Sequence, residues 1–202
     1  MKVLVAFASA LLAAAPAFGV TIVYTTSLSG PNENPPINSP GVGVATVTVD
    51  TTAHTLRVQE TFSGLTSGTT ASHIHCCNPP PATSGVATMT PTFSGLPLGV
   101  TFGSMDQTLD TTSLATYNAP FVTANGGTAL GAEAALFFGI AQGTAYVNIH
   151  TTQNPGGEIR GFLTPAAAVP EPETYALFLA GLASLGVAAR RRHRREVERR
   201  GD

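Results

Sequence analysis

The sequence predicts an all-β fold for its central part, residues 20–168, on the basis of three observations. Thr, Gly, Pro, Val and Ala dominate this body, which contains neither Lys nor Trp. Short runs alternate apolar and polar residues with a period of two, the pattern of a strand with one buried face. Long helical periodicity is absent before the C-terminal segment. At about 150 residues, the body is long enough for one sandwich or barrel with a hydrophobic core.

The N-terminal half of the body contains the clearest strands. Thr21–Leu28 is the first candidate, and Val44–Asp50 and Leu56–Phe62 follow it with clean alternation. Residues 51–54 join the two strands, so we expect an antiparallel hairpin with one buried face on each strand. His54 lies in the turn of this hairpin and is expected at the surface.

The C-terminal half of the body predicts three more strands and one helix. Strands are expected at Ala71–Cys76, Ala145–Thr151 and Glu158–Leu163. The Ala-rich run Gly131–Phe138 predicts a short helix. Residues 78–130 are rich in Pro, Gly and Thr, so we expect long connections there. Long connections on a β scaffold tend to be either functional or mobile.

A turn signal precedes two charged residues near the end of the body. Pro, Gly and Gly at 155–157 predict a hairpin turn, because Pro presets φ at the first central position and Gly permits positive φ at the second. Beyond this turn, Glu158 and Arg160 fall on one face of the strand. Arg57 is the only other cation of the body. Arg160 is therefore expected to form a structural ion pair with either Glu158 or Glu33, the alternative being an anion site around Arg160.

The charge of the body excludes one class of partner. Two cations stand against seven acids, so the body has a net charge of −5 with its histidines neutral. Nucleic-acid binding requires clustered cations that neutralise phosphates, and we expect none here. The arginine run near the C-terminus lies outside the body and fits membrane topology, because such arginines stay on the cytoplasmic side.

Three histidines form a candidate metal site. His73 and His75 are separated by one residue, and residues i and i+2 of a strand share a face about 6.5 to 7 Å apart. His150 would join them if the strand Ala145–Thr151 lies beside Ala71–Cys76. Three imidazoles are a ligand set suited to Zn or Cu. Two alternatives are open: histidines that only bind backbone carbonyls, and a histidine that acts as a catalytic general base.

Cys76 and Cys77 are the only cysteines of the chain, and they are adjacent. In an exported protein the usual state of cysteines is a disulfide, so a vicinal disulfide is one interpretation. Two reduced thiols that stabilise a turn are another. The third is a thiol site for a soft metal, beside the two histidines that precede it.

The N-terminus predicts a secretory signal peptide over residues 1–19. Lys2 provides a positive charge, Val3–Ala15 provides an apolar core, and Ala15-Pro16-Ala17 provides small residues for a signal-peptidase site. This segment is therefore excluded from the fold.

The C-terminal segment, residues 166–202, predicts a second sorting signal. Pro170, Glu171 and Pro172 precede an apolar run, Tyr175–Ala189, and a cluster of arginines. We expect the run to form a hydrophobic helix, although it is shorter than the about 20 residues of a stable spanning helix. In this order the three parts resemble the PEP-CTERM sorting signal of Gram-negative bacteria. The resemblance implies removal of the tag by an exosortase at the inner membrane and export of the body to the cell surface or extracellular matrix. An ordinary tail anchor is the alternative.

The body also resembles a known family through three segments. The segments are residues 28–36, residues 71–75, and residues 145–151 followed by residues 155–161. In this order they resemble the CHRD domain, named after chordin, over essentially the whole body, which we assign as one domain, residues 20–165. The resemblance implies an immunoglobulin-like or Greek-key β-sandwich and no particular chemistry. The adjacent cysteines are not expected from the animal members of this family.

The sequence contains no nucleophile elbow, no phosphate-binding glycine loop and no convincing pair of catalytic carboxylates. We therefore do not expect an enzyme. One hypothesis is a non-catalytic β-sandwich protein of the cell surface or matrix that binds a protein or a polysaccharide. The other is an extracytoplasmic copper or zinc protein whose ligands are His73, His75 and His150.

Overall fold

The computed structural model describes residues 21–167, residues 177–186 and residue 190. The chain divides into two compact units, Met1–Ala166 and Ala167–Asp202. The expected signal peptide and the Pro170-Glu171-Pro172 motif lie outside the described residues.

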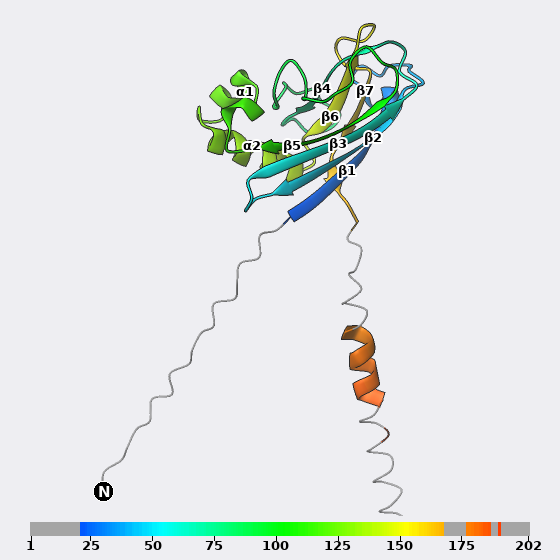
Figure 1. The fold of residues 1–202 in the computed structure, drawn as a ribbon, viewed down its shortest axis with the longest axis vertical. Helices are drawn as coiled ribbons and strands as arrows, with labels where there is room; N and C mark the ends of the chain where they lie inside the picture. Colours follow the sequence, from blue (N-terminus) through cyan, green and yellow to red (C-terminus); the bar gives the residue numbers. More distant parts are fainter. Residues whose placement is uncertain (1–20, 168–176, 187–189, 191–202) are drawn as a thin grey trace, which may run out of the picture. The chain divides into compact units, whose positions relative to one another are not determined.

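The first unit is mostly β structure with a few short helices (Figure 1). Its strands are β1 (Thr21–Ser29), β2 (Val42–Asp50), β3 (Thr55–Ser63), β4 (Thr69–His75), β5 (Gly103–Asp110), β6 (Tyr146–Thr151), β7 (Ile159–Phe162) and β8 (Thr164–Pro165). Its helices are α1 (Ala119–Ala124) and α2 (Ala129–Ala141), with 3₁₀ turns η1 (Gly30–Asn32) and η2 (Leu114–Thr116).

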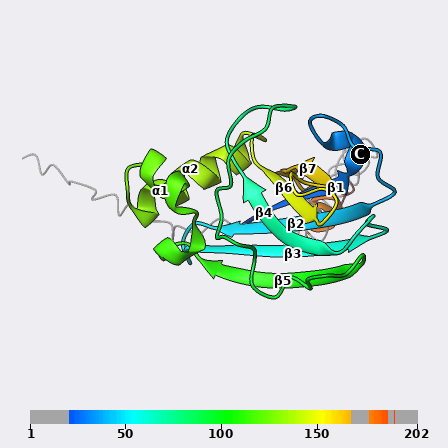
Figure 2. The same cartoon turned by 90° about the horizontal axis from the view of Figure 1, so that it is seen from above.

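The strands form one antiparallel sheet in the order β4-β6-β7-β1-β2-β3-β5, with β8 added beside β1. The all-β prediction is confirmed, but the expected two-sheet sandwich is not what the described strands form. Strand β1 joins the two halves, because it pairs along its length with β2 and also meets β7 at Ser29 and Arg160. The sheet curls so that the β4-β6-β7 half stands over the β2-β3-β5 half (Figure 2).

The curl explains how one sheet encloses a core. Val47 and Val58 from one half and Ile74 and Val147 from the other are fully buried members of the same apolar cluster. A twisted sheet of this length can bend its apolar face around a core, and the result buries the same alternating residues that a sandwich would bury.

The expected hairpin of β2 and β3 is confirmed, with Val47 opposite Val58. His54 lies in its turn with a positive φ of 51°. The imidazole is not a free surface group: its Nδ1 lies 2.9 Å from Glu133 Oε1 on α2, and the side chain is 43% exposed. This contact ties the hairpin to the helix.

Between β4 and β6 the structure contains more regular elements than the sequence predicted. The expected helix Gly131–Phe138 lies within α2, which Thr128 caps by accepting a hydrogen bond from Gly131 N at 3.1 Å. Strand β5 and helix α1 were expected to be loop. Only Met105 and Leu109 of β5 are apolar and buried, so the strand arises from its pairing with β3 rather than from a local pattern.

The edge strand β4 is covered by the segment that follows it. Backbone amides of Cys76, Ala87 and Phe93 bond to Gly85, Ile74 and Ser72 respectively, at 2.9 to 3.3 Å. Residues 85–93 therefore run along the free edge of β4, and this cover positions the groups that surround the histidines.

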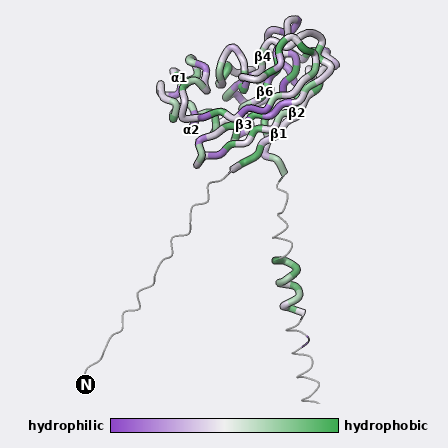
Figure 3. The backbone as a smooth tube through the Cα atoms, in the orientation of Figure 1, coloured by the Kyte–Doolittle hydropathy of each residue, from purple (hydrophilic) through white to green (hydrophobic). Residues whose placement is uncertain are grey.

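The C-terminal unit contains a helix over residues 177–186, whose residues are all exposed and mostly coloured as hydrophobic in Figure 3. Among the described residues, no helix combines the length and the apolar character needed to cross a membrane.

A carboxyl group lies inside the core of the first unit. Glu60 on β3 is 2% exposed, and its Oε1 accepts a hydrogen bond from Ser72 Oγ at 2.8 Å. Burial raises the pKa of Glu60 to about 7, against the lowering effect of the Ser72 hydroxyl. The folded state therefore favours the protonated carboxyl.

This burial predicts a pH dependence of stability. The pKa of Glu60 is about 7 in the folded protein and 4.5 when unfolded. The contribution of Glu60 to the free energy of unfolding is therefore fully present below pH 4.5 and is lost as the pH rises through 7. Glu60→Gln should remove this loss and raise the free energy of unfolding at pH 8.5 by about 3 kcal/mol relative to the wild type. Urea unfolding of both proteins at pH 4.5 and pH 8.5 measures the difference, and an equal pH dependence in both would contradict it.

Candidate metal centre

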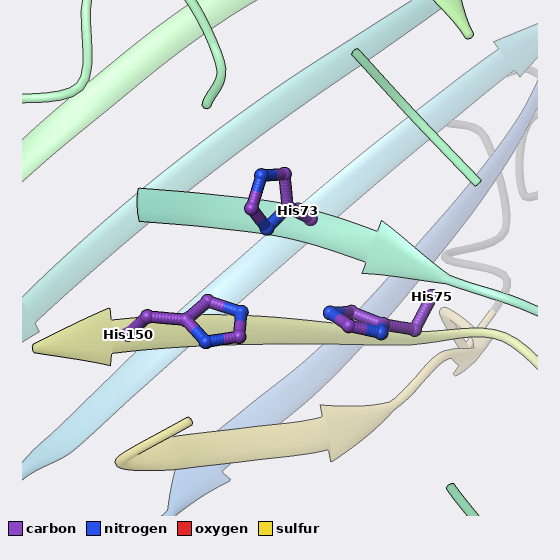
Figure 4. A group of neighbouring side chains, drawn as sticks. All are labelled: His73, His75 and His150. Carbon is purple, nitrogen blue, oxygen red and sulfur yellow. The ribbon is translucent and has the colours of Figure 1, made fainter. Parts of the chain in front are cut away.

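Strand alternation brings the three predicted histidines to one face of the sheet. His73 and His75 project from β4 on the face opposite to Ile74, which packs in the core. Strand β6 lies directly beside β4, with Ala71 opposite His150, so the condition for His150 to join the other two histidines is met. Figure 4 shows the rings of His75 and His150 turned toward each other along β6, with His73 next to them.

The three rings form a compact triangle. Their centroids are 5.9 Å apart for His73 and His75, 5.2 Å for His73 and His150, and 5.6 Å for His75 and His150. One ring nitrogen from each histidine can be chosen so that all three nitrogens lie within 4.8 Å of one another. The spacing allows one ion to contact all three residues.

Each imidazole has one nitrogen bonded to a backbone carbonyl. His73 Nε2 lies 2.8 Å from Pro91 O, His75 Nδ1 lies 2.9 Å from Ser84 O, and His150 Nδ1 lies 2.9 Å from Pro155 O. A carbonyl oxygen only accepts hydrogen bonds, so each of these nitrogens carries the proton. The other nitrogen of each neutral ring then carries a lone pair.

The second nitrogens have no hydrogen-bond partner among the described residues. His73 Nδ1, His75 Nε2 and His150 Nε2 are all buried. Unpaired buried polar atoms are costly, and three in one cluster require an explanation.

The environment keeps these imidazoles neutral. Burial lowers the pKa of His73 and of His75 to about 4, against the raising effect of their carbonyl partners. Burial also lowers the pKa of His150. Neutral imidazole is the form that binds a metal ion.

The residues fit a transition metal. Imidazole nitrogens bind Zn at about 2.0–2.1 Å, which places two ligands of a tetrahedral site about 3.4 Å apart. The separation of up to 4.8 Å would therefore close by about 1.4 Å on binding. Carbonyls that fix the second nitrogen are the usual outer partners of metal-binding histidines.

The comparison with protein families agrees with the sequence. The CHRD domain model matches residues 24–163, which include all three histidines and every strand from β2 to β7. The chain belongs to the CHRD domain family. Neither the curated proteins nor the solved structures contained a match to the chain.

A second model, the PEP-CTERM protein-sorting motif, matches residues 168–192. This motif implies that the CHRD protein is exported, sorted to the cell surface and processed by an exosortase.

In the CHRD domain, Cys76 and Cys77 are joined to each other in a disulfide. The bonded sulfurs cannot act as thiolate ligands, so in this state they do not extend the histidine set. They pack instead against α2, where a Cβ at Gly139 would overlap Cys76 Sγ and approach Cys77 Sγ to 2.7 Å. Glycine is therefore required at position 139.

Of the two partners expected for Arg160, the nearer is Glu33. Arg160 Nε lies 3.7 Å from Glu33 Oε2, and the guanidinium also donates from Nε to Asn32 O at 2.6 Å and from Nη2 to Pro81 O at 2.8 Å. Burial raises the pKa of Glu33 to about 7, although the nearby guanidinium lowers it. Arg160 therefore binds protein carbonyls as well as a carboxyl group.

Glu158 has a different environment from Arg160. Its carboxylate accepts hydrogen bonds from Ser39 Oγ, from the backbone and hydroxyl of Thr66, and from Thr151 Oγ1, at 2.6 to 2.9 Å. The carboxylate thus joins three segments that are distant in the sequence.

The turn before Glu158 also supports the histidines. Gly157 N donates to Asn154 O at 3.0 Å, and the positive φ of 124° falls on Gly157, one residue later than the turn signal predicted. A Cβ at this position would overlap the amide of Asn148. The same turn supplies Pro155 O, the partner of His150.

Sequence reasoning missed the groups around the ligands. Pro91 and Ser84 lie in the stretch expected to be loop, and nothing in their residue type indicates contact with a histidine. Tyr146 could have been found, because it shares a strand face with His150. In the structure its ring stacks on His75, with centroids 4.9 Å apart and an angle of 7° between the planes.

Proposed function

We propose that this protein is an exported, exosortase-processed CHRD protein that binds a transition metal, copper or zinc, outside the cytoplasm at His73, His75 and His150. One observation carries the proposal. Three buried imidazoles have one nitrogen each on a backbone carbonyl and the other without a partner in the described structure.

Physical chemistry supports a metal over a purely structural cluster. A structural histidine stabilises a fold when both nitrogens are satisfied or one faces water. Here the second nitrogens are buried together, and their lone pairs would repel one another without a cation. An ion would replace that cost with three coordinate bonds, and imidazole suits both Cu and Zn.

The proposed role is binding rather than catalysis. His73, His75 and His150 are only 6%, 7% and 8% exposed, so the ligands are enclosed by the fold. An enclosed site is suited to holding an ion and admits only small molecules. The inner membrane and its exosortase are then partners of the C-terminal tag before the body is released.

A second function, contact with an extracellular protein or polysaccharide, is supported by the surface sorting and by one surface pocket. The pocket has a volume of about 590 Å³. Its lining includes Pro31, Asn34, Pro81 and Phe162. This function and metal binding use different residues and are compatible.

Metal analysis of the protein without its tag, produced by periplasmic export, tests the metal proposal. We expect one Cu or Zn per chain, and we expect the double variant His73→Ala, His75→Ala to lose it, with an affinity reduced at least a hundredfold because two of three ligands are removed. His54→Ala is the matched control, because His54 lies outside the cluster and should leave the metal content unchanged. A wild-type protein that stays metal-free and gains no thermal stability from added Cu or Zn would refute the proposal.

A further inference from the structure

The loop after the disulfide reaches the metal centre through one residue. We call residues 78–85 the proline loop, since Pro occupies positions 79–81. Ser84 O, near its end, lies 2.9 Å from His75 Nδ1. This carbonyl decides which nitrogen of His75 carries the proton and which is left for an ion.

Tyr146 holds that same residue. The amide of Ser84 donates to the Tyr146 phenol oxygen at 3.0 Å, and the phenol hydroxyl lies 3.3 Å from Ser84 O. Tyr146 is 1% exposed, and its ring stacks on the imidazole of His75. One side chain therefore contacts both the ligand and the backbone group that orients it.

The proline loop has further anchors, which bind other groups than the Ser84 backbone: Asn78 Nδ2 donates to Thr83 O at 2.8 Å, and Cys76 N donates to Gly85 O at 3.2 Å. Arg160 Nη2 and Asn34 Nδ2 donate to Pro81 O at 2.8 and 3.1 Å, three residues before Ser84. Asn78 N donates to Ser84 Oγ at 2.9 Å, which holds the side chain rather than the carbonyl. Of these contacts, only the phenol acts on the backbone of Ser84 itself.

We propose that Tyr146 is a positioning residue of the metal centre. Its hydroxyl holds Ser84 O against His75 Nδ1, so that the imidazole keeps its proton on Nδ1 and offers Nε2 to the ion. This inference rests on the proposed function for its effect on metal affinity, but its effect on the His75 ring applies to the metal-free protein as well.

Tyr146→Phe tests the proposal, because the ring and its stacking are kept and only the hydroxyl is removed. In the metal-free protein, long-range ¹H–¹⁵N NMR of the histidine rings should show His75 protonated at Nδ1 in the wild type and a mixture of tautomers in the variant. In the metal-loaded protein, the dissociation constant should rise about tenfold, the lower end of the range for the loss of an outer partner.

Two controls separate positioning from general stability. Tyr117→Phe removes the hydroxyl of another buried tyrosine, which donates to Thr111 O at 3.0 Å and lies outside the histidine cluster. It should change neither the His75 tautomer nor the affinity. His150 is the internal control, because its partner is Pro155 O, outside the proline loop. Its tautomer should be the same in both variants.

The outcomes distinguish this inference from the proposed function. If the wild type binds no metal, the function fails, and the tautomer of His75 still decides the role of Tyr146. If Tyr146→Phe leaves both the tautomer and the dissociation constant at their wild-type values, the positioning role is overturned. If it shifts the rings of His75 and His150 equally, the effect is general loosening, and the proposal is also overturned.

Discussion

Replacing Arg160 by methionine is expected to lower the free energy of unfolding by about 3–5 kcal/mol, the range for breaking a buried charged network by removing one partner. Arg160 is fully buried, and its guanidinium satisfies the carbonyls of Asn32 and Pro81 in two separate loops. Methionine fills a similar volume but donates no hydrogen bond. The two carbonyls would then lose their donor, and the buried Glu33 carboxyl would lose the nearby guanidinium.

Arg57→Met is the matched control for this change. Arg57 pairs with Asp106 on the surface, where the two side chains are 47% and 49% exposed. A solvent-exposed pair contributes about 0–1 kcal/mol, so the two arginine variants should differ by several kcal/mol in urea unfolding. Equal losses would show that the burial of Arg160 has no energetic consequence.

Replacing Glu158 by glutamine is expected to cost about 3 kcal/mol at pH 7. The carboxylate accepts four hydrogen bonds from Ser39, Thr66 and Thr151, and its residue is fully buried. Glutamine is neutral, so the donors would lose their charged acceptor, and its NH₂ group could only replace Oε2 if the hydroxyls of Thr66 and Thr151 turned to accept from it. Hydrogen bonds to a charged group are each worth about 1.5–3 kcal/mol.

The effect of Glu158→Gln should depend on pH. Burial alone would raise the pKa of Glu158, but the hydrogen bonds from Ser39, Thr151 and Thr66 outweigh it, and the pKa is lowered from 4.5. The stabilisation is therefore present above pH 4.5 and is lost as the pH falls through the folded pKa. Unfolding curves at pH 7 and pH 3 should show a large difference between wild type and variant at pH 7 and a smaller one at pH 3.

Glu60→Gln provides the opposite case within the same chain. It should stabilise the protein at high pH, since the folded pKa of Glu60 is raised rather than lowered.

A Glu158→Gln variant that matches the wild type in stability at pH 7 would mean that the four contacts do not stabilise the charged form of Glu158.

The strand pattern explains which parts of the fold could be predicted. Alternation identified β2 and β3 as a hairpin and placed His73 and His75 on one face, because the side-chain period of a strand is fixed by its backbone. It left the placement of His150 conditional on the pairing of two strands, and the pairing of β4 with β6 meets that condition. The single curled sheet was not predicted, since a sandwich and a half-barrel bury the same alternating residues.

The surroundings of the histidines could not be predicted in this way. Pro91, Ser84 and Pro155 contribute only backbone carbonyls, and every residue type has a carbonyl. Which loop carbonyl meets which imidazole depends on how residues 78–93 and 154–157 fold back over the sheet, and no local pattern encodes that path. The same holds for Arg160, for which the sequence left two carboxylate partners open.

By itself, the sequence determined the C-terminal sorting motif, the all-β class and the placement of His73 and His75 on one strand face. These follow from local composition and from a period of two, which act over a few residues. The tertiary structure alone decided that the sheet curls into one body, that Arg160 is nearest to Glu33, and that each histidine keeps one buried nitrogen without a partner. These features depend on contacts between segments that are distant in the chain, whose geometry is set by packing of the whole core.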